Sequence, residues 1–314
     1  MPESGASGDE VQVTGVLRQL QDDLIVLTKA RLSFLVVMTA CFGYFVATKG
    51  QHTFSWVTFF HMFLGTTLAA SGASVFNQLM EVDSDGRMER TSDRPLPAQR
   101  LPKPLAFILG WLLCAFGLIH LGVKVNVHAS IMAGATLLTY LFVYTPLKRV
   151  SSANTLVGAV SGALPPLIGW AAGGQPLLSL GAAFLFCLLF FWQLPHFAAI
   201  NWMYREEYVR GGFKMWSNDD ESGKKTGKIA LFYSVCLLLL GLAFPLLTPL
   251  MAWWGALGGG ALAGLMIYLA ARFLISGERK DARVLFFYTL LYLPLMMVVS
   301  YFSWSAIQSV NVVQ

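Results

Sequence analysis

Three polar residues at helical spacing stand out in an otherwise apolar sequence. Asn77, Glu81 and Asp85 follow one another at intervals of four, so at ~100° per residue they stay within roughly 80° on one helical face. An amide and two carboxylates on one stripe, with no base between them, are hard oxygen donors that suit Mg²⁺. We therefore predict a magnesium site on these three residues. Asp83 is a further catalytic candidate, although a continuous helix would point it about 160° away from the centre of the stripe.

Basic residues follow this cluster directly. Arg90 and Arg94 lie within ten residues of Asp85, and guanidinium groups beside a carboxylate–Mg²⁺ site would bind an anion such as a diphosphate. The segment has no GxxxxGK[ST] pattern, which argues against a nucleotide P-loop. The alternative is a solvated loop whose arginines serve only topology. That alternative does not explain why the polar stripe starts where an apolar segment ends. A charge placed at membrane depth there costs at least ~2.5–3.5 kcal/mol.

A second polar cluster, WQLPHFAAINWMYREEYVRGG, covers residues 192–212. Counting from His196, positions 203, 207 and 210 fall on one helical face, which places Glu207 and Arg210 in line with the histidine. We predict a second site on His196 and Glu207, with Arg210 directed to the diphosphate. The alternative for His196 is a hydrogen-bonded histidine of the protein core.

The composition indicates which environment these clusters occupy. Apolar residues make up 56% of the 314 residues and charged residues 12%, about half the roughly 25% typical of soluble proteins. So few charges cannot cover a soluble fold of this size, and the sequence predicts a polytopic membrane protein. The cysteines lie in apolar runs without a CxxC pair, which indicates neither a disulfide framework nor a zinc site; they are Cys41, Cys114, Cys187 and Cys236.

Apolar segments long enough to cross a bilayer recur along the chain. A span needs about 20 mostly apolar residues, and nine segments qualify: roughly 32–48, 56–77, 104–122, 127–147, 155–173, 178–200, 229–250, 253–275 and 284–303. The sequence therefore predicts an all-α fold with nine transmembrane helices over residues 25–304. Residues 1–24 are expected to form a disordered cytoplasmic tail, and 305–314 a short external tail.

The basic residues fix the orientation of these spans. Of the 22 lysines and arginines, 20 flank the spans on one side, and only Lys49 and Lys124 lie on the other. Because basic residues stay inside, we expect a cytoplasmic N-terminus, an external C-terminus and a site that faces the cytoplasm. The basic pI near 9.0 is thus a matter of topology, which argues against nucleic acid as a partner.

The first polar cluster resembles a known motif. The pattern N-x-x-x-[DE]-x-D-x-D-x-x-M-x-R-T-x-x-R-P starts at the predicted end of the second span and resembles the first aspartate-rich motif of the UbiA superfamily of intramembrane prenyltransferases. The resemblance implies a UbiA-like helical bundle in which Asn77, Glu81 and Asp85 hold Mg²⁺ against an isoprenoid diphosphate. Many relatives have aspartate at the position of Glu81, which conserves the charge.

Two further segments bear on the same resemblance. The segment YTPLKR resembles the aromatic-plus-basic motif after the fourth span of the family. The resemblance implies that Lys148 and Arg149 contact the diphosphate and that Tyr144 lies toward the acceptor. Most of the superfamily ends the sixth span in a second aspartate-rich motif. Here His196 stands where the family often has an aspartate, and Glu207 stands near the later one.

The WQLPHF and REEYVRGG segments, with NTLVGAVSGALPPLIGW at 154–170 and LTKAR before the first span, resemble the protohaem IX farnesyltransferase (haem O synthase) family, although Ala30 replaces a usual proline. The resemblance covers residues 25–303. It implies transfer of farnesyl from farnesyl diphosphate to a vinyl group of haem B, with water, in a cell inner membrane. Mg²⁺ is then the cofactor, and haem A synthase or terminal-oxidase assembly factors are candidate partners. For His196 it adds contact with haem to the two interpretations above.

Three other functions deserve comparison. A prenyltransferase for a quinone precursor or a chlorophyll-like acceptor would share the fold, but the WQLPH text in place of the second aspartate-rich motif counts against it. A transporter would place polar groups at mid-membrane and in both leaflets, whereas here they gather at one side. A non-catalytic haem-binding assembly protein would not need the ladder of Asn77, Glu81 and Asp85.

Overall fold

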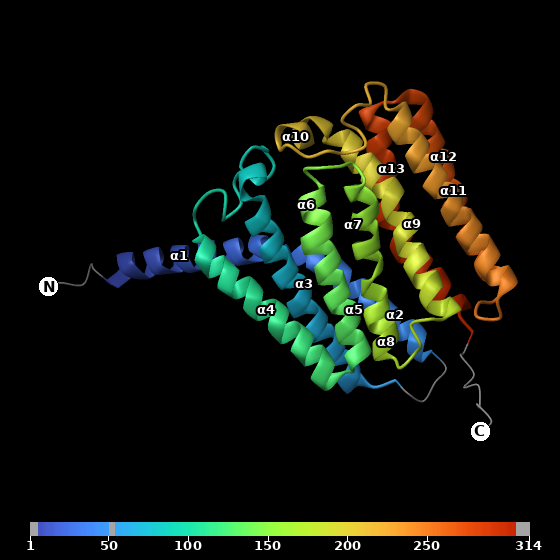
Figure 1. Cartoon of the computed structure of the whole chain (residues 1–314), viewed down its shortest axis with the longest axis horizontal. Coiled ribbons are helices and arrows are strands. Elements are labelled where there is room, and N and C mark those ends of the chain that lie inside the picture. Colours follow the sequence, from blue (N-terminus) through green and yellow to red (C-terminus); the bar gives the residue numbers. More distant parts are fainter. Residues whose placement is uncertain (1–5, 50–53, 306–314) are drawn as a thin grey trace.

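The computed structural model describes residues 6–49 and 54–305. Within these ranges the chain forms one bundle of helices (Figure 1), and its only β-type pairing is an isolated bridge between Met251 and Trp304. The all-α prediction is therefore confirmed for the described residues.

Nine helical segments in this part of the chain are long and apolar enough to cross a membrane, as the sequence predicts. Each overlaps one of the predicted spans, and the second continues beyond its apolar run to Asp85. They are α2 (Ala30–Thr48), α3 (Trp56–Asp85), α4 (Lys103–Lys124), α5 to α6 (Val127–Leu147), α7 to α8 (Asn154–Ala172), α9 (Leu180–Met203), α11 (Lys224–Leu247), α12 (Trp254–Ser276) and α13 (Arg279–Ser303).

Two of these spans are irregular, whereas the sequence predicts continuous helices. The fourth changes from α5 (Val127–Leu138) to a π-helical segment, η1 (Thr139–Tyr144), before the short α6 (Thr145–Leu147). Pro146 follows this segment and has no backbone donor, while the Thr145 backbone N–H reaches back to Tyr140 O. The fifth span divides at Leu164 into α7 (Asn154–Ala163) and α8 (Pro165–Ala172), where two prolines begin the second helix.

Helices α8 and α2 pack so closely that their backbones are in contact. A Cβ atom added to Gly43 would lie 1.9 Å from Pro166 O, and one added to Gly169 would lie 1.8 Å from Ala40 O. Small residues allow such close approach between membrane helices. Helix α2 also packs against α3, which carries part of the site described below.

The N-terminal segment differs from the predicted tail. Residues Ala6–Leu27 form helix α1, which extends sideways from the bundle in Figure 1, although the sequence predicts disorder over residues 1–24. The reason is that Leu17, Leu20 and Leu24 recur at helical spacing, and Arg100 binds the buried carboxylate of Asp23 at 2.9 Å. Residues 1–5 of this tail and 306–314 of the C-terminal tail lie outside the described residues.

The connections at the two ends of the bundle differ in charge. The α3–α4 connection, the short helix α10 (Arg205–Arg210) and the α12–α13 connection lie together at one end in Figure 1, which we call the charged end. At the opposite end Lys49 donates to the backbone oxygens of Tyr301 and Phe302, the latter at 3.1 Å. The predicted site residues at the end of α3 therefore lie at the charged end.

Candidate active site

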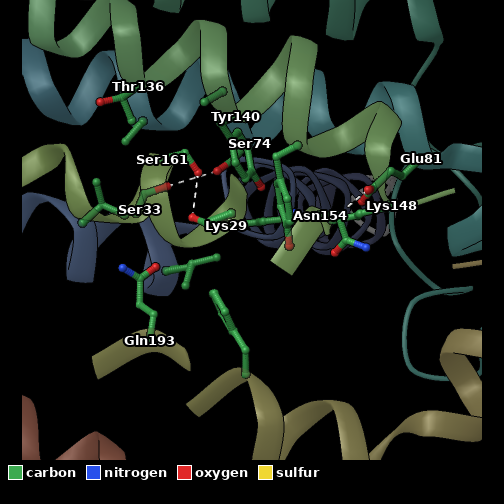
Figure 2. A pocket seen from close by; sticks show the side chains of 18 of the residues that line it. Lys29, Ser33, Ser74, Glu81, Thr136, Tyr140, Lys148, Asn154, Ser161 and Gln193 are labelled. Carbon is green, nitrogen blue, oxygen red and sulfur yellow. Dashed lines mark hydrogen bonds and ion pairs between the residues drawn. The ribbon is translucent and has the colours of Figure 1, made fainter. Parts of the chain in front are cut away.

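A cavity of about 420 Å³ opens from the charged end into the bundle. Figure 2 shows Glu81, Lys148 and Asn154 at one end of this cavity, with Ser33, Thr136 and Gln193 farther along it. Charged side chains line the first part: Lys29, Glu81, Asp85, Arg90, Arg94 and Lys148. Apolar side chains line much of the rest, among them Leu32, Val36, Ala69, Leu137, Ile168 and Phe197.

Helix α3 aligns the predicted ladder as the periodicity requires. Because the helix continues to Asp85, Asn77, Glu81 and Asp85 share one face, and all three are buried, with exposed fractions of 0%, 4% and 1%. Asp83 lies on the opposite face and is exposed, which agrees with its predicted direction. Glu81 and Asp85 line the cavity directly, whereas Asn77 is buried just behind its wall.

Each member of the ladder has a polar partner. Lys148 Nζ lies 2.8 Å from Glu81 Oε1, and Arg94 lies 2.7 Å from Asp85 Oδ2. The Asn77 amide accepts a hydrogen bond from Lys29 and donates one to Thr145 Oγ1 at 3.2 Å. These pairs offset the cost of burying charged groups at membrane depth.

Lys29 is a site residue, although its charge and position in the sequence predict only a contribution to topology. It lies between α1 and α2 in a left-handed conformation with φ of 47°, which turns its side chain to Asn77 and the cavity. Burial, together with the nearby Arg94, lowers the pKa of Lys29 to about 7. The one sequence signal was its place in the LTKAR text.

The charged end of the cavity carries an excess of positive charge. Four basic side chains line it, against the two carboxylates of Glu81 and Asp85. Arg90 lies over the Tyr204 ring, 5.3 Å from its centroid, and its neighbour Thr91 donates to Asp85 O at 2.8 Å. This arrangement favours a multiply charged anion next to the ladder.

The aromatic-plus-basic motif divides between the cavity and the surface. Tyr144 and Lys148 line the cavity, with the ammonium group 4.5 Å from the ring centroid. Burial alone would lower the pKa of Lys148, but the Glu81 carboxylate raises it above its usual value. Arg149 is exposed and donates to Met80 O at 3.1 Å, so the structure does not bring it to the cavity.

The prediction that residues 196–210 share one helical face is wrong. Helix α9 ends at Met203, and Tyr204 leaves helical geometry with φ of −116° and ψ of 22° before α10 starts. The following loop turns the chain, because Ser217 Oγ donates to Asn201 O at 2.9 Å and Arg205 donates to Asp220 O at 3.0 Å.

The two later members of the predicted second cluster consequently lie away from the cavity. Glu207 is half-buried on α10, and its Oε2 has no hydrogen-bond partner among the described residues. Arg210 is exposed at the end of α10. Neither side chain contributes to the wall of the cavity in the part of the chain that is described.

His196, in contrast, lines the cavity. Its Nδ1 lies 2.8 Å from Thr289 Oγ1 of α13, and its ring stacks between Trp192 and Phe286. Neither Thr289 nor Phe286 belongs to a motif that marks it as a site residue in the sequence. Asn201 also lines the cavity, and its Nδ2 is buried without a partner among the described residues. His196 is therefore both anchored to the scaffold and open to a bound molecule.

The chemistry of the ladder fits a magnesium ion. Asn77, Glu81 and Asp85 offer only hard oxygen donors at the mouth of an anion-favouring cavity. Among the described residues no three His, Cys, Asp or Glu side chains converge on one point, and the ladder itself has two carboxylates and one amide. Lys29, Lys148 and Arg94 neutralise or bind those oxygens in the structure.

The chain is similar in sequence to known proteins. The model of the UbiA prenyltransferase family matches residues 36–292. A protein of Opitutus terrae named protoheme IX farnesyltransferase is 40% identical over 88% of this chain and 92% of its own.

Two solved structures share the fold at low sequence identity. A structure described as digeranylgeranylglyceryl phosphate synthase superimposes with a TM-score of 0.75 at 15% identity, over 90% of this chain and 98% of its own. A UbiA homolog from Archaeoglobus fulgidus, bound to GPP and Mg²⁺, does so with a TM-score of 0.63 at 15% identity, over 88% and 99%.

Proposed function

The chain belongs to the UbiA prenyltransferase family, and we propose that it transfers farnesyl from farnesyl diphosphate to a vinyl group of haem B, giving haem O and diphosphate. It is a multi-pass membrane prenyltransferase. The observation that carries the proposal is the cavity, which joins a positively charged end to a long apolar part. Such a cavity matches an amphipathic isoprenoid diphosphate. The 40% identity to a protoheme IX farnesyltransferase supports haem B as the acceptor.

In this proposal the charged end binds the diphosphate. Asn77, Glu81 and Asp85 would hold Mg²⁺, which when bound supplies positive charge that stabilises the departing diphosphate. Arg90, Arg94, Lys148 and Lys29 bind the diphosphate oxygens, because their side chains line the same end of the cavity. We leave Asp83, Arg149 and Arg210 out of this set, since all three are exposed and none lines the cavity.

The apolar part of the cavity houses the farnesyl chain and excludes bulk water. The bond between farnesyl C1 and oxygen breaks, its electron pair leaves with the diphosphate, and an allylic cation remains that requires a dry, preorganised pocket. The terminal carbon of the haem vinyl group then bonds to C1. A water molecule adds its oxygen to the neighbouring carbon and releases a proton, which gives the hydroxyethylfarnesyl product.

The α9 wall supplies the proposed haem contacts. His196 and Asn201 both line the cavity; Asn201 lies five residues nearer the charged end, and its amide nitrogen is buried without a partner among the described residues. Five residues of helix advance about 7.5 Å, a separation comparable with that between the iron and the propionates of a haem. We propose that His196 contacts the iron and that Asn201 donates to a propionate.

We further propose that the charged end faces the cytoplasm in a cell inner membrane, with the C-terminus outside. Twenty of 22 basic residues lie on the side of the predicted site, while Lys49 lies beside the end of α13 at the opposite end. Because haem O would leave into the bilayer, haem A synthase or terminal-oxidase assembly factors are proposed partners. A reporter active only outside the cytoplasm should be active after Gln314 and silent within residues 215–225; the reverse pattern would contradict this orientation.

The direct test of function is an assay with purified protein in lipid nanodiscs. Haem B, farnesyl diphosphate and Mg²⁺ should give haem O by mass spectrometry, and chelation of Mg²⁺ should stop its formation. Transfer to a quinone precursor or a chlorophyll-like acceptor, without transfer to haem B, would overturn the acceptor and leave the prenyltransferase class intact. Absence of any prenyl transfer would contradict the proposal.

A further inference from the structure

Helix α13 holds two rings of α9 through a single residue. Thr289 is fully buried; its hydroxyl lies 2.8 Å from His196 Nδ1, and its backbone oxygen accepts the Trp192 Nε1–H at 2.7 Å. The His196 ring is stacked between Trp192 and Phe286, with centroid distances of 5.5 and 4.9 Å. The imidazole therefore has one fixed orientation with respect to the cavity.

The direction of the bond between His196 and Thr289 follows from a second contact of the threonine hydroxyl. Thr289 Oγ1 lies 2.5 Å from the backbone oxygen of Phe286, and two oxygens at that separation require a proton between them. A threonine hydroxyl has one proton to donate. Since that proton is directed to Phe286, the hydroxyl accepts a hydrogen bond from His196 Nδ1–H.

This hydrogen bond determines which ring nitrogen remains basic. A neutral imidazole with a proton on Nδ1 has its lone pair on Nε2, at the other side of the ring. Nε2 has no hydrogen-bond partner among the described residues, and His196 is the one histidine among the described residues that line the cavity. A neutral imidazole nitrogen aimed into a cavity is a ligand for iron.

We propose that Thr289 is a positioning residue that fixes His196 in the Nδ1–H form, so that Nε2 faces the cavity and ligates the iron of haem B. The inference deepens the proposed function and rests on it for the identity of the iron. The tautomer itself follows from the contacts among Thr289, Phe286 and His196. Residues that orient a metal-ligating histidine typically change metal affinity 10–100-fold when altered.

The tautomer can be measured in the unaltered chain. Nitrogen-15 NMR of histidine-labelled protein in lipid vesicles distinguishes a protonated Nδ1 from a protonated Nε2, and His196→Gln assigns the signal by its loss. We expect a proton on Nδ1 of His196 without any haem present. A proton on Nε2 would overturn the inference.

The effect on haem is measured with a pair of variants. Thr289→Val keeps the shape and removes the hydroxyl, and we expect haem B affinity to fall about 10–100-fold, with loss of the absorbance of a histidine-ligated iron. Thr289→Ser keeps the hydroxyl and should restore both. Labelled farnesyl diphosphate should bind both variants as it binds the wild type. Wild-type haem binding by Thr289→Val, or loss of both ligands, would contradict a positioning role.

A double variant separates positioning from a general structural role. In a His196→Ala background, Thr289→Val should cause no further loss of haem affinity, because the two residues act through one bond. An equal loss in both backgrounds would overturn the inference. If the wild type neither binds haem B nor forms haem O, the proposed function fails instead. The serine variant and the NMR measurement decide the matter should Thr289→Val not fold.

Discussion

The two polar clusters of this protein both contribute side chains to one cavity and are built in different ways. The first is carried by a single uninterrupted helix, on which Asn77, Glu81 and Asp85 stay in register to the last turn of α3. Their cationic partners reach them from the adjoining segments. One periodic element thus sets the geometry of the first cluster.

The second cluster has no such common element. Helix α9 ends at Met203 and contributes His196 and Asn201 to the cavity wall, together with Gln193, Phe197 and Ile200, while Glu207 follows on α10 outside it. The orientation of His196 is set by Thr289, which comes from α13, 93 residues later. Tertiary packing between distant segments therefore sets the geometry of the second cluster.

The difference predicts which function each cluster serves. The first has an excess of positive charge around hard oxygen donors, which suits a diphosphate with its metal. The second has aromatic rings and a neutral imidazole, which suit a flat apolar acceptor containing iron. Variants in the two clusters should therefore affect two different ligands.

The largest effect is expected from the ladder itself. Asp85→Asn removes a buried charge that balances Arg94 and would hold Mg²⁺, and we expect turnover to fall by roughly a thousandfold, the upper range for loss of one group that stabilises a transition state. The measurement is haem O formation at saturating Mg²⁺. Asp83→Asn is the matched control, because Asp83 is two residues away and exposed.

Near-normal turnover of Asp85→Asn would remove the ladder from the mechanism. A large loss in Asp83→Asn would show that the helical face of α3 is not what selects the catalytic carboxylates. Both variants should remain in the membrane fraction, since neither alters an apolar span.

The next largest effect is expected from two variants that should each lose affinity for a different ligand. His196→Ala should weaken haem B binding about 10–100-fold and spare farnesyl diphosphate, whereas Glu81→Gln should lose diphosphate affinity and keep haem. Haem absorbance and labelled farnesyl diphosphate measure the two affinities separately. If His196→Ala instead loses the diphosphate and keeps haem, His196 belongs to the diphosphate site.

The same contrast explains what could be predicted from the sequence. Span positions and the α3 ladder depend on composition and on the helical period, and both are confirmed in the described residues. The end of α9 and the role of Thr289 depend on contacts of the later loop and of α13, which have no local signature. Lys29 was missed for a similar reason, because its left-handed backbone rather than its position in the chain turns it to Asn77.

A smaller effect is expected from a comparison of Lys29, which lines the cavity, with Arg149, which belongs to the YTPLKR motif but is exposed. Lys29→Met should weaken farnesyl diphosphate binding about tenfold, which is the lower range for a charge-assisted hydrogen bond, because Lys29 lines the charged end of the cavity. Arg149→Met should leave this affinity unchanged, although the family motif includes it, because Arg149 is exposed and bonded to Met80 O. The opposite ranking in equilibrium binding would mean that the motif identifies the site better than the cavity does.

The smallest effect is expected from Arg210, because the helical face predicted to join it to His196 ends at Tyr204. Arg210 would lie beside the diphosphate if α9 continued without interruption, but Tyr204 ends that helix and Arg210 is exposed at the end of α10. An exposed charge away from the cavity contributes within about 0.5 kcal/mol, so Arg210→Gln should change farnesyl diphosphate affinity by about twofold or less. Arg94→Gln, which removes a cavity-lining guanidinium paired with Asp85, is the comparison and should lose at least about tenfold. A loss in Arg210→Gln equal to that in Arg94→Gln would require α10 to move Arg210 into the cavity when substrate binds.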